Sequence, residues 1–287
     1  MNKGLIPVIS GYVIWGFFPL YWALLNHVNP SEILVHRILW SVPVLFFLVY
    51  FKPTWKANFR KSISSKNELS FLIITSILIT INWGGYILAV SLGRVVEASM
   101  GYFLSPVINM IGGYIFFHER ISKIKQVAVF LATIGALYYV FSGDTFPWLG
   151  LIIGFTFSAY GIARKAMITS AVPGLFIETL ILLPFIFIFS FWFYANYDIA
   201  FFNVNVSTDV LLFLAGAVTV LPLALFTAGS KILPMTTVGI MFLVAPSIQF
   251  LVGYYLQNEA VNSNQLIGFV GVWAGLIIYS YALVKNQ

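Results

Sequence analysis

The chain has 287 residues, of which 60% are hydrophobic and 8% charged, and its mean hydropathy is +0.95. An ordinary soluble domain is about 25% charged, so this composition excludes one and predicts a protein whose solvent is lipid. The net charge is +6. The chain has no cysteine, which excludes disulfides, thiolate nucleophiles and cysteine-based metal sites.

Apolar runs separated by short connections predict membrane-spanning helices, because about 20 apolar residues cross a bilayer. In chain order, we expect ten: 4–26, 31–51, 69–91, 95–117, 124–142, 147–166, 171–195, 209–230, 235–257 and 264–284. The longest connection runs from Lys52 to Glu68, so no separate soluble domain is expected. The first run is too long for the apolar region of a signal peptide, and we expect it to be retained. The prediction is an all-α polytopic membrane protein.

The basic residues predict how these helices are oriented. If the N-terminus is inside, all but Arg37 and Arg94 of the 15 lysines and arginines lie at the inner side. Cytoplasmic loops carry an excess of Lys and Arg, so we expect both termini in the cytoplasm and the protein in the inner, cytoplasmic membrane. Because these residues connect apolar spans, the positive charge indicates orientation and not nucleic-acid binding.

The second half of the chain repeats the first at a spacing of 140 residues. Pro106, Gly113, Tyr114, Glu119 and Gly135 recur as Pro246, Gly253, Tyr254, Glu259 and Gly275. The halves are 1–143 and 144–287, with the boundary near 143–146, and each is predicted to hold five helices. Because five is odd, the second half is expected to enter the bilayer inverted. Inverted five-helix repeats are typical of secondary transporters.

Segments spread over residues 10 to 284 also carry a resemblance to a known family. They include GYVIWGFFPLYWAL, SEILVHRILWS, INWGGYILAV, VEASMGYFLSPVINMIGGYIFFHER, GIARK, IETLILLP and LPLALFTAGSKILPMTTVGIMFLVAPSIQFL. These segments resemble the RarD branch of the EamA family, within the drug/metabolite transporter superfamily. The resemblance implies ten helices, two inverted repeats and solute export across the inner membrane. The RarD name carries an association with chloramphenicol.

Ionisable residues inside predicted spans are candidates for function, since lipid makes them costly. These are His36 and Arg37 in the second predicted helix and Glu178 in the seventh. A spacing of 141 aligns Arg37 with Glu178, which puts opposite charges at equivalent positions of the two halves. Each is expected to reach a central cavity and contact substrate or a gating partner. His36 is expected to titrate near neutral pH in a proton-coupled cycle, or to be a hydrogen-bonded spacer.

Several glutamates offer alternatives. Arg37 could instead snorkel to the outer interface, or pair with Glu97 or Glu32 as a structural clamp. Glu97 is either a gate partner for Arg37 or a carboxylate that complements a helix N-terminus. Glu32 is expected to be interfacial for the same reason. Glu119 and Glu259, at the ends of the fourth and ninth helices, are expected to be structural.

Polar and aromatic residues within the spans form a second class of candidates. Corresponding glycine and proline interruptions in the third and eighth helices, at Gly84-Gly85 and Pro222, suggest flexible or cavity-lining backbone. Pro106 and Pro246 are expected either to let the fourth and ninth helices flex or to make static kinks. The residues expected to line a cavity are Trp15, Asn82, Trp83, Tyr86, Tyr102, Asn109, Tyr160 and Gln249.

The function predicted from these features is secondary transport of a small organic solute, a metabolite or an amphipathic or aromatic drug, by alternating access. No G-x-x-x-x-G-K-[ST] segment is present, so transport is expected to run downhill or with protons, without a bound cofactor. The alternative is a channel, sensor or scaffold. No H-E-x-x-H or G-x-S-x-G motif suggests an enzyme, and the three histidines are too far apart in sequence to suggest a metal site.

Overall fold

The computed structural model describes residues 2–142, 146–258 and 261–285, and all regular structure in these residues is helical. The helices are α1 Asn2–Gly16, α2 Phe18–Ala23, α3 Pro30–Phe51, α4 Pro53–Ile63, α5 Lys66–Ser91, α6 Val95–Gly101, the 3-10 turn η1 Tyr102–Leu104, α7 Ser105–Phe117, α8 Lys123–Ser142, α9 Trp148–Ala166, α10 Ala171–Asn196, α11 Val206–Ser230, α12 Met235–Phe242, α13 Val244–Leu256 and α14 Ser263–Lys285. The proposed boundary between the halves falls partly on 143–145, outside the described residues.

Eight of these helical segments are long and apolar enough to cross a membrane. They are Gly4–Ala23, Pro30–Phe51, Lys66–Ser91, Val95–Phe117, Lys123–Ser142, Ala171–Asn196, Val206–Ser230 and Met235–Leu256. The chain is therefore a polytopic α-helical membrane protein. The two other predicted spans are also helical, as α9 and α14, but they are not among the eight, so a total of ten crossings stays a prediction.

One helix was not expected. The segment assigned as the longest connection contains α4, an 11-residue helix with lysines and arginines on its exposed side. Lys52 lies over the ring of Trp55 at 4.0 Å, a cation–π contact suited to the polar edge of a membrane. Apolar length, the criterion that predicted the spans, does not detect α4, because a helix at the interface needs only a narrow apolar face.

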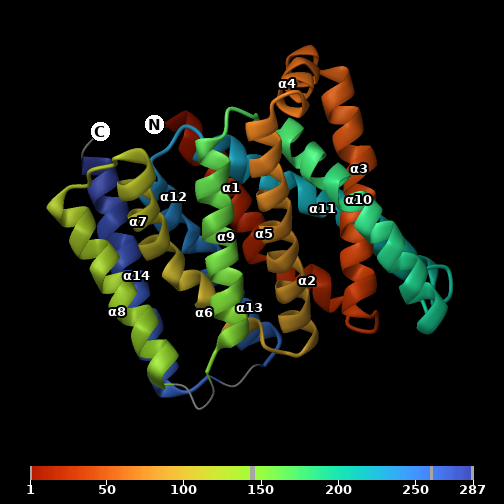
Figure 1. The fold of residues 1–287 in the computed structure, drawn as a ribbon. Helices are drawn as coiled ribbons and strands as arrows, with labels where there is room; N and C mark the ends of the chain where they lie inside the picture. The colour runs from red at the N-terminus through yellow and green to blue at the C-terminus, as the bar shows by residue number, and fades with distance from the viewer. Residues whose placement is uncertain (1, 143–145, 259–260, 286–287) are drawn as a thin grey trace.

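The helix starts are set by short polar side chains. Asn29, Ser65 and Asn205 each accept a hydrogen bond from a backbone N–H in the first turn of α3, α5 and α11. Such caps satisfy amides that the helix itself leaves unpaired. The first turns of α3 and α11 lie on one side of the molecule, and that of α5 lies on the other (Figure 1).

The molecule has two ends. The start of α1, the end of α14 and α4 lie together at the top of Figure 1, and we call this end the α4 face. The connections from α2 to α3, from α5 to α6 and from α10 to α11 lie at the other end, the opposite face. The first and last helices therefore begin and end on the same side of the molecule, as an even number of crossings requires.

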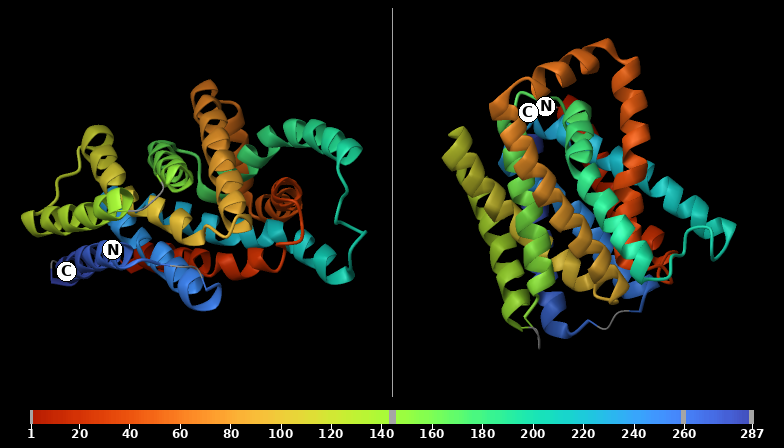
Figure 2. Two further views of the ribbon diagram at one scale, coloured as in Figure 1. Left: turned by 90° about the horizontal axis from the view of Figure 1, so that it is seen from below. Right: turned by 45° about the vertical axis from the view of Figure 1, so that its right-hand side comes forward.

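Helices from the two halves of the sequence pack against each other throughout. The closest associations join α8 to α14, α1 to α11, α5 to α9, α3 to both α10 and α11, and α7 to α12. Figure 2 shows α8 and α14 as a pair at the edge of the bundle. The remaining helices surround a buried core, so neither half forms a separate body.

Glycines allow the backbones of α6 and α9 to approach each other closely. A Cβ atom on Gly101 of α6 would lie 1.5 Å from the carbonyl oxygen of Gly150 in α9. A Cβ on Gly154, one turn along α9, would lie 2.1 Å from the carbonyl oxygen of Gly101. The two backbones therefore touch without intervening side chains, an arrangement that membrane helices use because lipid supplies no hydrophobic force to hold them together.

Replacing Gly101 with alanine is expected to destabilise the folded protein by at least about 1–3 kcal/mol, the usual cost of overpacking, because the clash is with backbone that cannot rotate away. Thermal unfolding in detergent measures the change. Gly84→Ala is the matched control, since a Cβ there meets only a leucine methyl at 3.4 Å. Equal melting temperatures for the two variants would show that α6 and α9 separate freely.

The fourth and ninth predicted spans are broken at positions that the predicted repeat would make equivalent. The fourth changes from α6 through η1 to α7 at Tyr102–Leu104, just before Pro106. The ninth changes from α12 to α13 at Leu243, just before Pro246. A proline lacks an N–H and crowds the preceding turn, which explains both breaks. The breaks bring irregular backbone to the centre of the molecule.

The interruptions expected in the third and eighth spans are absent. Gly84-Gly85 lies within the continuous helix α5, and Pro222 lies within the continuous helix α11. Glycine keeps its backbone hydrogen bond, and in lipid an unpaired backbone group is costly, so α5 has no reason to break. The carbonyl of Pro222 is instead approached closely by Gly11 of α1, which packs against α11.

Candidate functional site

A small cavity lies at the centre of the bundle and is the candidate site. Its lining residues are Trp15, Phe18, Arg37, Asn82, Trp83, Tyr86, Tyr102, Phe157, Phe242 and Gln249, and all of them except Trp15 are buried. Its volume is about 30 Å³. One water needs roughly 10–15 Å³ by this measure, whereas pockets for drug-sized ligands span about 300–1,000 Å³. The cavity would therefore have to widen to admit an organic solute.

Aromatic rings form one side of this cavity. Phe157 of α9 stacks on Phe242 at 4.7 Å between ring centroids and meets Trp15 edge-on at 5.2 Å. Tyr102 contacts Phe242 edge-on at 4.8 Å. These rings come from four different spans. Edge-to-face and offset contacts of this kind add about 0.5–1.5 kcal/mol each beyond burial, and their faces suit a flat apolar solute.

Arg37 faces this aromatic wall from α3. The residue is 2% exposed, and its guanidinium lies between the rings of Trp22 and Trp83, 4.7 and 4.9 Å from their centroids. Its Nε donates to Thr219 Oγ1 at 3.0 Å, while Nη1 is buried and has no hydrogen-bond partner among the described residues. Snorkelling of Arg37 to the outer interface, one of the alternatives above, is therefore contradicted.

Two amides from opposite halves hold the cavity's polar edge. Asn82 Nδ2 donates to the carbonyl of Ile153 at 2.7 Å, and Gln249 Nε2 donates to the carbonyl of Trp15 at 3.0 Å. Each amide thereby ties two spans together. Gln249 Oε1 is buried without a partner among the described residues, so it remains able to accept a hydrogen bond from a solute. Asn109 does not line the cavity and packs instead against Gly239 of α12.

Glu178 lies apart from the cavity, in a buried cluster nearer the α4 face. Its Oε1 accepts from Thr75 Oγ1 at 2.5 Å, and its Oε2 accepts from the Tyr160 hydroxyl at 3.2 Å. Arg164 Nη1 is 3.6 Å from Oε1. Arg164 is 0% exposed and donates to the carbonyls of Ser170 and Ala171. The expectations that Glu178 and Tyr160 reach a central cavity are thus not met in this conformation.

Arg164 is one of the basic residues expected at the inner side, and its burial near the end of α9 was not predicted. A Cβ on Gly174 would lie 2.0 Å from Arg164 Nη1, so only glycine leaves room for the guanidinium over α10. The spacing of Gly174 and Glu178, one helical turn apart, is the only sequence signal for this site, and it is weak.

Polar contacts on the α4 face join the start of α5 and the end of α11 to the connection between α9 and α10, and we call this set of contacts the first clamp. Glu68, at the start of α5, accepts hydrogen bonds from the backbone N–H groups of Ile168 at 3.1 Å and Thr169 at 2.9 Å, and from the Thr169 hydroxyl. Lys231, just after α11, donates to the carbonyls of Met167, at 3.0 Å, and Thr169. Burial and repulsion by Arg164, opposed by attraction to Glu68, lower the pKa of Lys231 to about 8.

Polar contacts on the opposite face join the start of α3 to the connection between α10 and α11, and we call this set of contacts the second clamp. Glu32, at the start of α3, accepts from the backbone N–H groups of Ala200 and Phe201 at 2.9–3.0 Å. His27 Nε2 and Thr208 Oγ1 are hydrogen-bonded at 2.8 Å. Glu32 lies in the first turn of α3, as expected, but it is 0% exposed and its carboxylate binds the connection between α10 and α11. That connection folds back over the bundle, which no local pattern predicts.

His36 and Glu97 have partners other than those expected. His36 Nδ1 accepts from Trp40 Nε1 at 2.8 Å, and its ring lies 4.5 Å from that of Phe201, away from the cavity. Glu97 forms an ion pair with Arg94, the residue three positions earlier. The contact expected between Arg37 and Glu97 is therefore absent from this conformation.

Glu119 joins helices on the α4 face. Its Oε1 lies 2.6 Å from Lys165 Nζ and accepts from the backbone N–H of Met235 at 2.9 Å, at the start of α12. This position matches the structural role expected of Glu119. Its proposed repeat partner, Glu259, lies outside the described residues.

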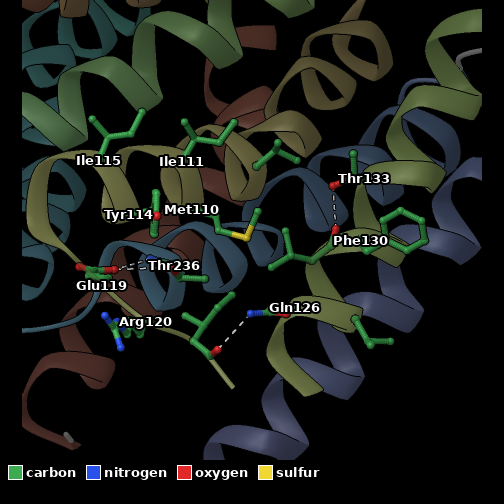
Figure 3. A pocket seen from close by; sticks show the side chains of 14 residues that line it. Met110, Ile111, Tyr114, Ile115, Glu119, Arg120, Gln126, Phe130, Thr133 and Thr236 are labelled. Carbon is green, nitrogen blue, oxygen red and sulfur yellow. Dashed lines mark hydrogen bonds between the residues drawn. The ribbon is translucent and has the colours of Figure 1, made fainter. Parts of the chain in front are cut away.

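A larger groove of about 1,090 Å³ runs along the side of the bundle between α7 and α8. Figure 3 shows Ile111 and Tyr114 of α7 and Phe130 of α8 lining it, with Glu119 and Arg120 at one end. Tyr114 and Phe130 are 69% and 63% exposed, on the lateral surface that lipid would cover. We therefore take this groove to be part of the lipid-facing surface, and the central cavity to be the solute site.

Known proteins resemble this chain over its whole length. The model of the EamA-like transporter family matches residues 2–141. An uncharacterized transporter of Bacillus subtilis, YojE, is 34% identical over 99% of this chain and 95% of its own length. The protein RarD of Escherichia coli is 32% identical over 100% of this chain and 96% of its own length. The chain belongs to the EamA-like transporter family.

It is a RarD-like member of the EamA family, and thus a membrane transporter of the drug/metabolite type. One solved protein structure superposes on it with a TM-score of 0.70, covering 98% of each chain at 14% identity, so the EamA fold extends to distant sequences. Among the described residues of this EamA protein, no group of three His, Asp or Glu side chains could hold a metal ion.

Proposed function

We propose that this RarD-like protein is a secondary transporter that moves a small organic solute, a metabolite or an amphipathic or aromatic drug, by alternating access. The observation that carries the proposal is a small cavity lined mostly by buried residues, which come from both halves of the chain. Arg37, Asn82, Trp83, Tyr86, Tyr102 and Gln249 contact the solute in this proposal. His36, Glu97, Asn109, Tyr160 and Glu178 act in coupling or gating.

The packing of helices supports an inverted repeat of 1–143 and 144–287. Such a repeat makes α1 equivalent to α9, α3 to α10, and α5 to α11. The contact of α1 with α11 then has its image in the contact of α9 with α5, and that of α3 with α11 in that of α10 with α5. An inverted pair of this kind lets two conformations be exchanged by swapping the roles of the halves.

The two clamps support alternating access, because they are repeat-related. A spacing of 140 makes Glu68 equivalent to Thr208, and a spacing of 141 makes Ile168 equivalent to His27. Glu68 bonds to Ile168 on the α4 face, and Thr208 bonds to His27 on the opposite face. Releasing one clamp while keeping the other would open the cavity to one side only.

Charge supports the orientation. The exposed basic residues of α4 make the α4 face the basic one, whereas the opposite face carries Arg94 as its lone loop cation among the described residues. We propose that the α4 face is cytoplasmic, that both termini lie there, and that α9 and α14 complete ten crossings of the cell membrane. Export from the cytoplasm, downhill or coupled to protons, is the proposed direction.

Reconstituted protein tests the function. A thermal-shift screen of amino acids, nucleosides, aromatic metabolites and amphenicol-type drugs first finds ligands, since binding to the folded state raises stability by RT ln(1 + [L]/Kd). Flux of each ligand into proteoliposomes is then measured with and without a pH gradient. We expect saturable flux. Flux that rises linearly with solute concentration would indicate a channel, and binding without flux a sensor or scaffold.

A further inference from the structure

We propose that the central cavity recognises an anionic group, a carboxylate in an organic solute, and that Arg37 supplies the opposing charge. The inference rests on the proposed transport function and specifies its substrate class. Arg37 lines the cavity at its polar side. An arginine keeps its positive charge at neutral pH, so the cavity wall carries a fixed cation.

Among the described residues, no side chain neutralises this charge. None of their carboxylates lies within 4.0 Å of Arg37, and the hydrogen bond from its Nε goes to the uncharged hydroxyl of Thr219. The flanking indoles of Trp22 and Trp83 offer attraction through their faces but carry no negative charge. A buried charge without a counter-ion is costly, so this arrangement indicates that the counter-ion comes from outside the chain.

Arg164 provides an internal comparison. It is as deeply buried as Arg37, yet it has Glu178 as a counter-ion and two backbone carbonyls as acceptors. The same fold thus supplies a counter-ion to a buried arginine that does not line the cavity. Arg37 differs in bordering the cavity and in having no carboxylate within 4.0 Å among the described residues.

The other lining groups fit one carboxylate on an apolar body. None of the ten lining residues is acidic, so no carboxylate of the cavity would offset the repulsion between Arg37 and a solute cation. The planar guanidinium matches the two oxygens of a carboxylate. The rings of Trp15, Phe157 and Phe242 provide the apolar surface opposite. A cavity of about 30 Å³ admits little more than such a head group, so the body of the solute requires opening.

Three compounds of nearly equal shape test the charge: 3-phenylpropanoate, 3-phenylpropanamide and 3-phenylpropylamine. Binding to purified wild-type protein is measured by thermal shift, and flux is measured in proteoliposomes. We expect the carboxylate to bind and the amide and amine to bind at least tenfold more weakly. Arg37→Gln should lower carboxylate affinity about 10- to 100-fold, the loss typical of a charge-assisted contact, while Arg37→Lys should keep part of it.

Arg60→Gln is the matched control, because it removes one exposed positive charge of α4, outside the cavity, and should leave binding unchanged. Equal binding of the three compounds, carboxylate binding that survives Arg37→Gln, or no carboxylate-dependent shift in folded wild-type protein would each overturn the inference. Transport of the amide or the amine would overturn this inference, but the proposed transport function would stand. Carboxylate binding that needs Arg37 but gives no flux would contradict the transporter and leave the anion site.

Discussion

Replacing Glu178 with leucine is expected to destabilise the protein by about 3–5 kcal/mol, the cost of breaking a buried ion pair from one side. The variant leaves Arg164 charged, 0% exposed and without its counter-ion, and it removes the acceptor of Thr75 and Tyr160. Thermal unfolding in detergent, with size-exclusion chromatography to follow aggregation, measures the loss. This is the largest stability effect that we expect from a single change in the described structure.

The double variant Arg164→Met with Glu178→Leu separates charge from packing. Apolar replacement of a whole buried pair is often neutral or stabilising, so the double variant should recover most of the stability lost in Glu178→Leu. If the single variant melts with the wild type, or the double variant is no better than the single one, the cluster is not an ion pair that stabilises the α4 side of the bundle.

Glu68→Gln is expected to open the cavity toward the α4 face. The change removes the negative charge that accepts two backbone N–H groups and the Thr169 hydroxyl, and contacts to a charged acceptor are worth about 1.5–3 kcal/mol each. Even one such loss shifts an open–closed equilibrium roughly tenfold or more. The chain contains no cysteine, so Ser158→Cys, at a buried position of α9 beside Phe157, makes a clean reporter. A membrane-impermeant thiol reagent added at the α4 face should label it at least about ten times faster in Glu68→Gln.

Glu32→Gln is the matched control on the other side, because Glu32 is also a buried carboxylate that accepts backbone N–H groups. It should speed labelling from the opposite face and not from the α4 face. If each variant speeds labelling equally from both sides, the two carboxylates hold the fold together and do not gate it.

The expected helices follow the described ones within a few residues, because helix length and apolarity are local properties that lipid enforces along each span. The prolines at 106 and 246 coincide with breaks for a local reason too, since a proline removes its own donor. Pro222 does not break α11, although its chemistry is the same. Its surroundings decide the outcome, because α1 packs against α11 at this proline.

The candidate site was foreseeable in part. Arg37, Asn82, Trp83, Tyr86, Tyr102 and Gln249, singled out from the sequence, do line one cavity. They could be found because polar and ionisable groups are rare and costly in lipid. Phe157 and Phe242 could not be found in this way, because one phenylalanine among 28 looks like any lipid-facing residue until the fold assembles the wall.

The lipid solvent, the class of fold and the family could be predicted from the sequence alone, because they depend on composition, apolar periodicity and the order of residues along the chain. Which charges meet could not be predicted in this way. Glu178 and Arg37 align in the repeat, yet Glu178 binds Arg164 and Arg37 meets indoles and a cavity. Charge pairing depends on distances of a few ångströms between helices far apart in sequence, and helix packing sets those distances.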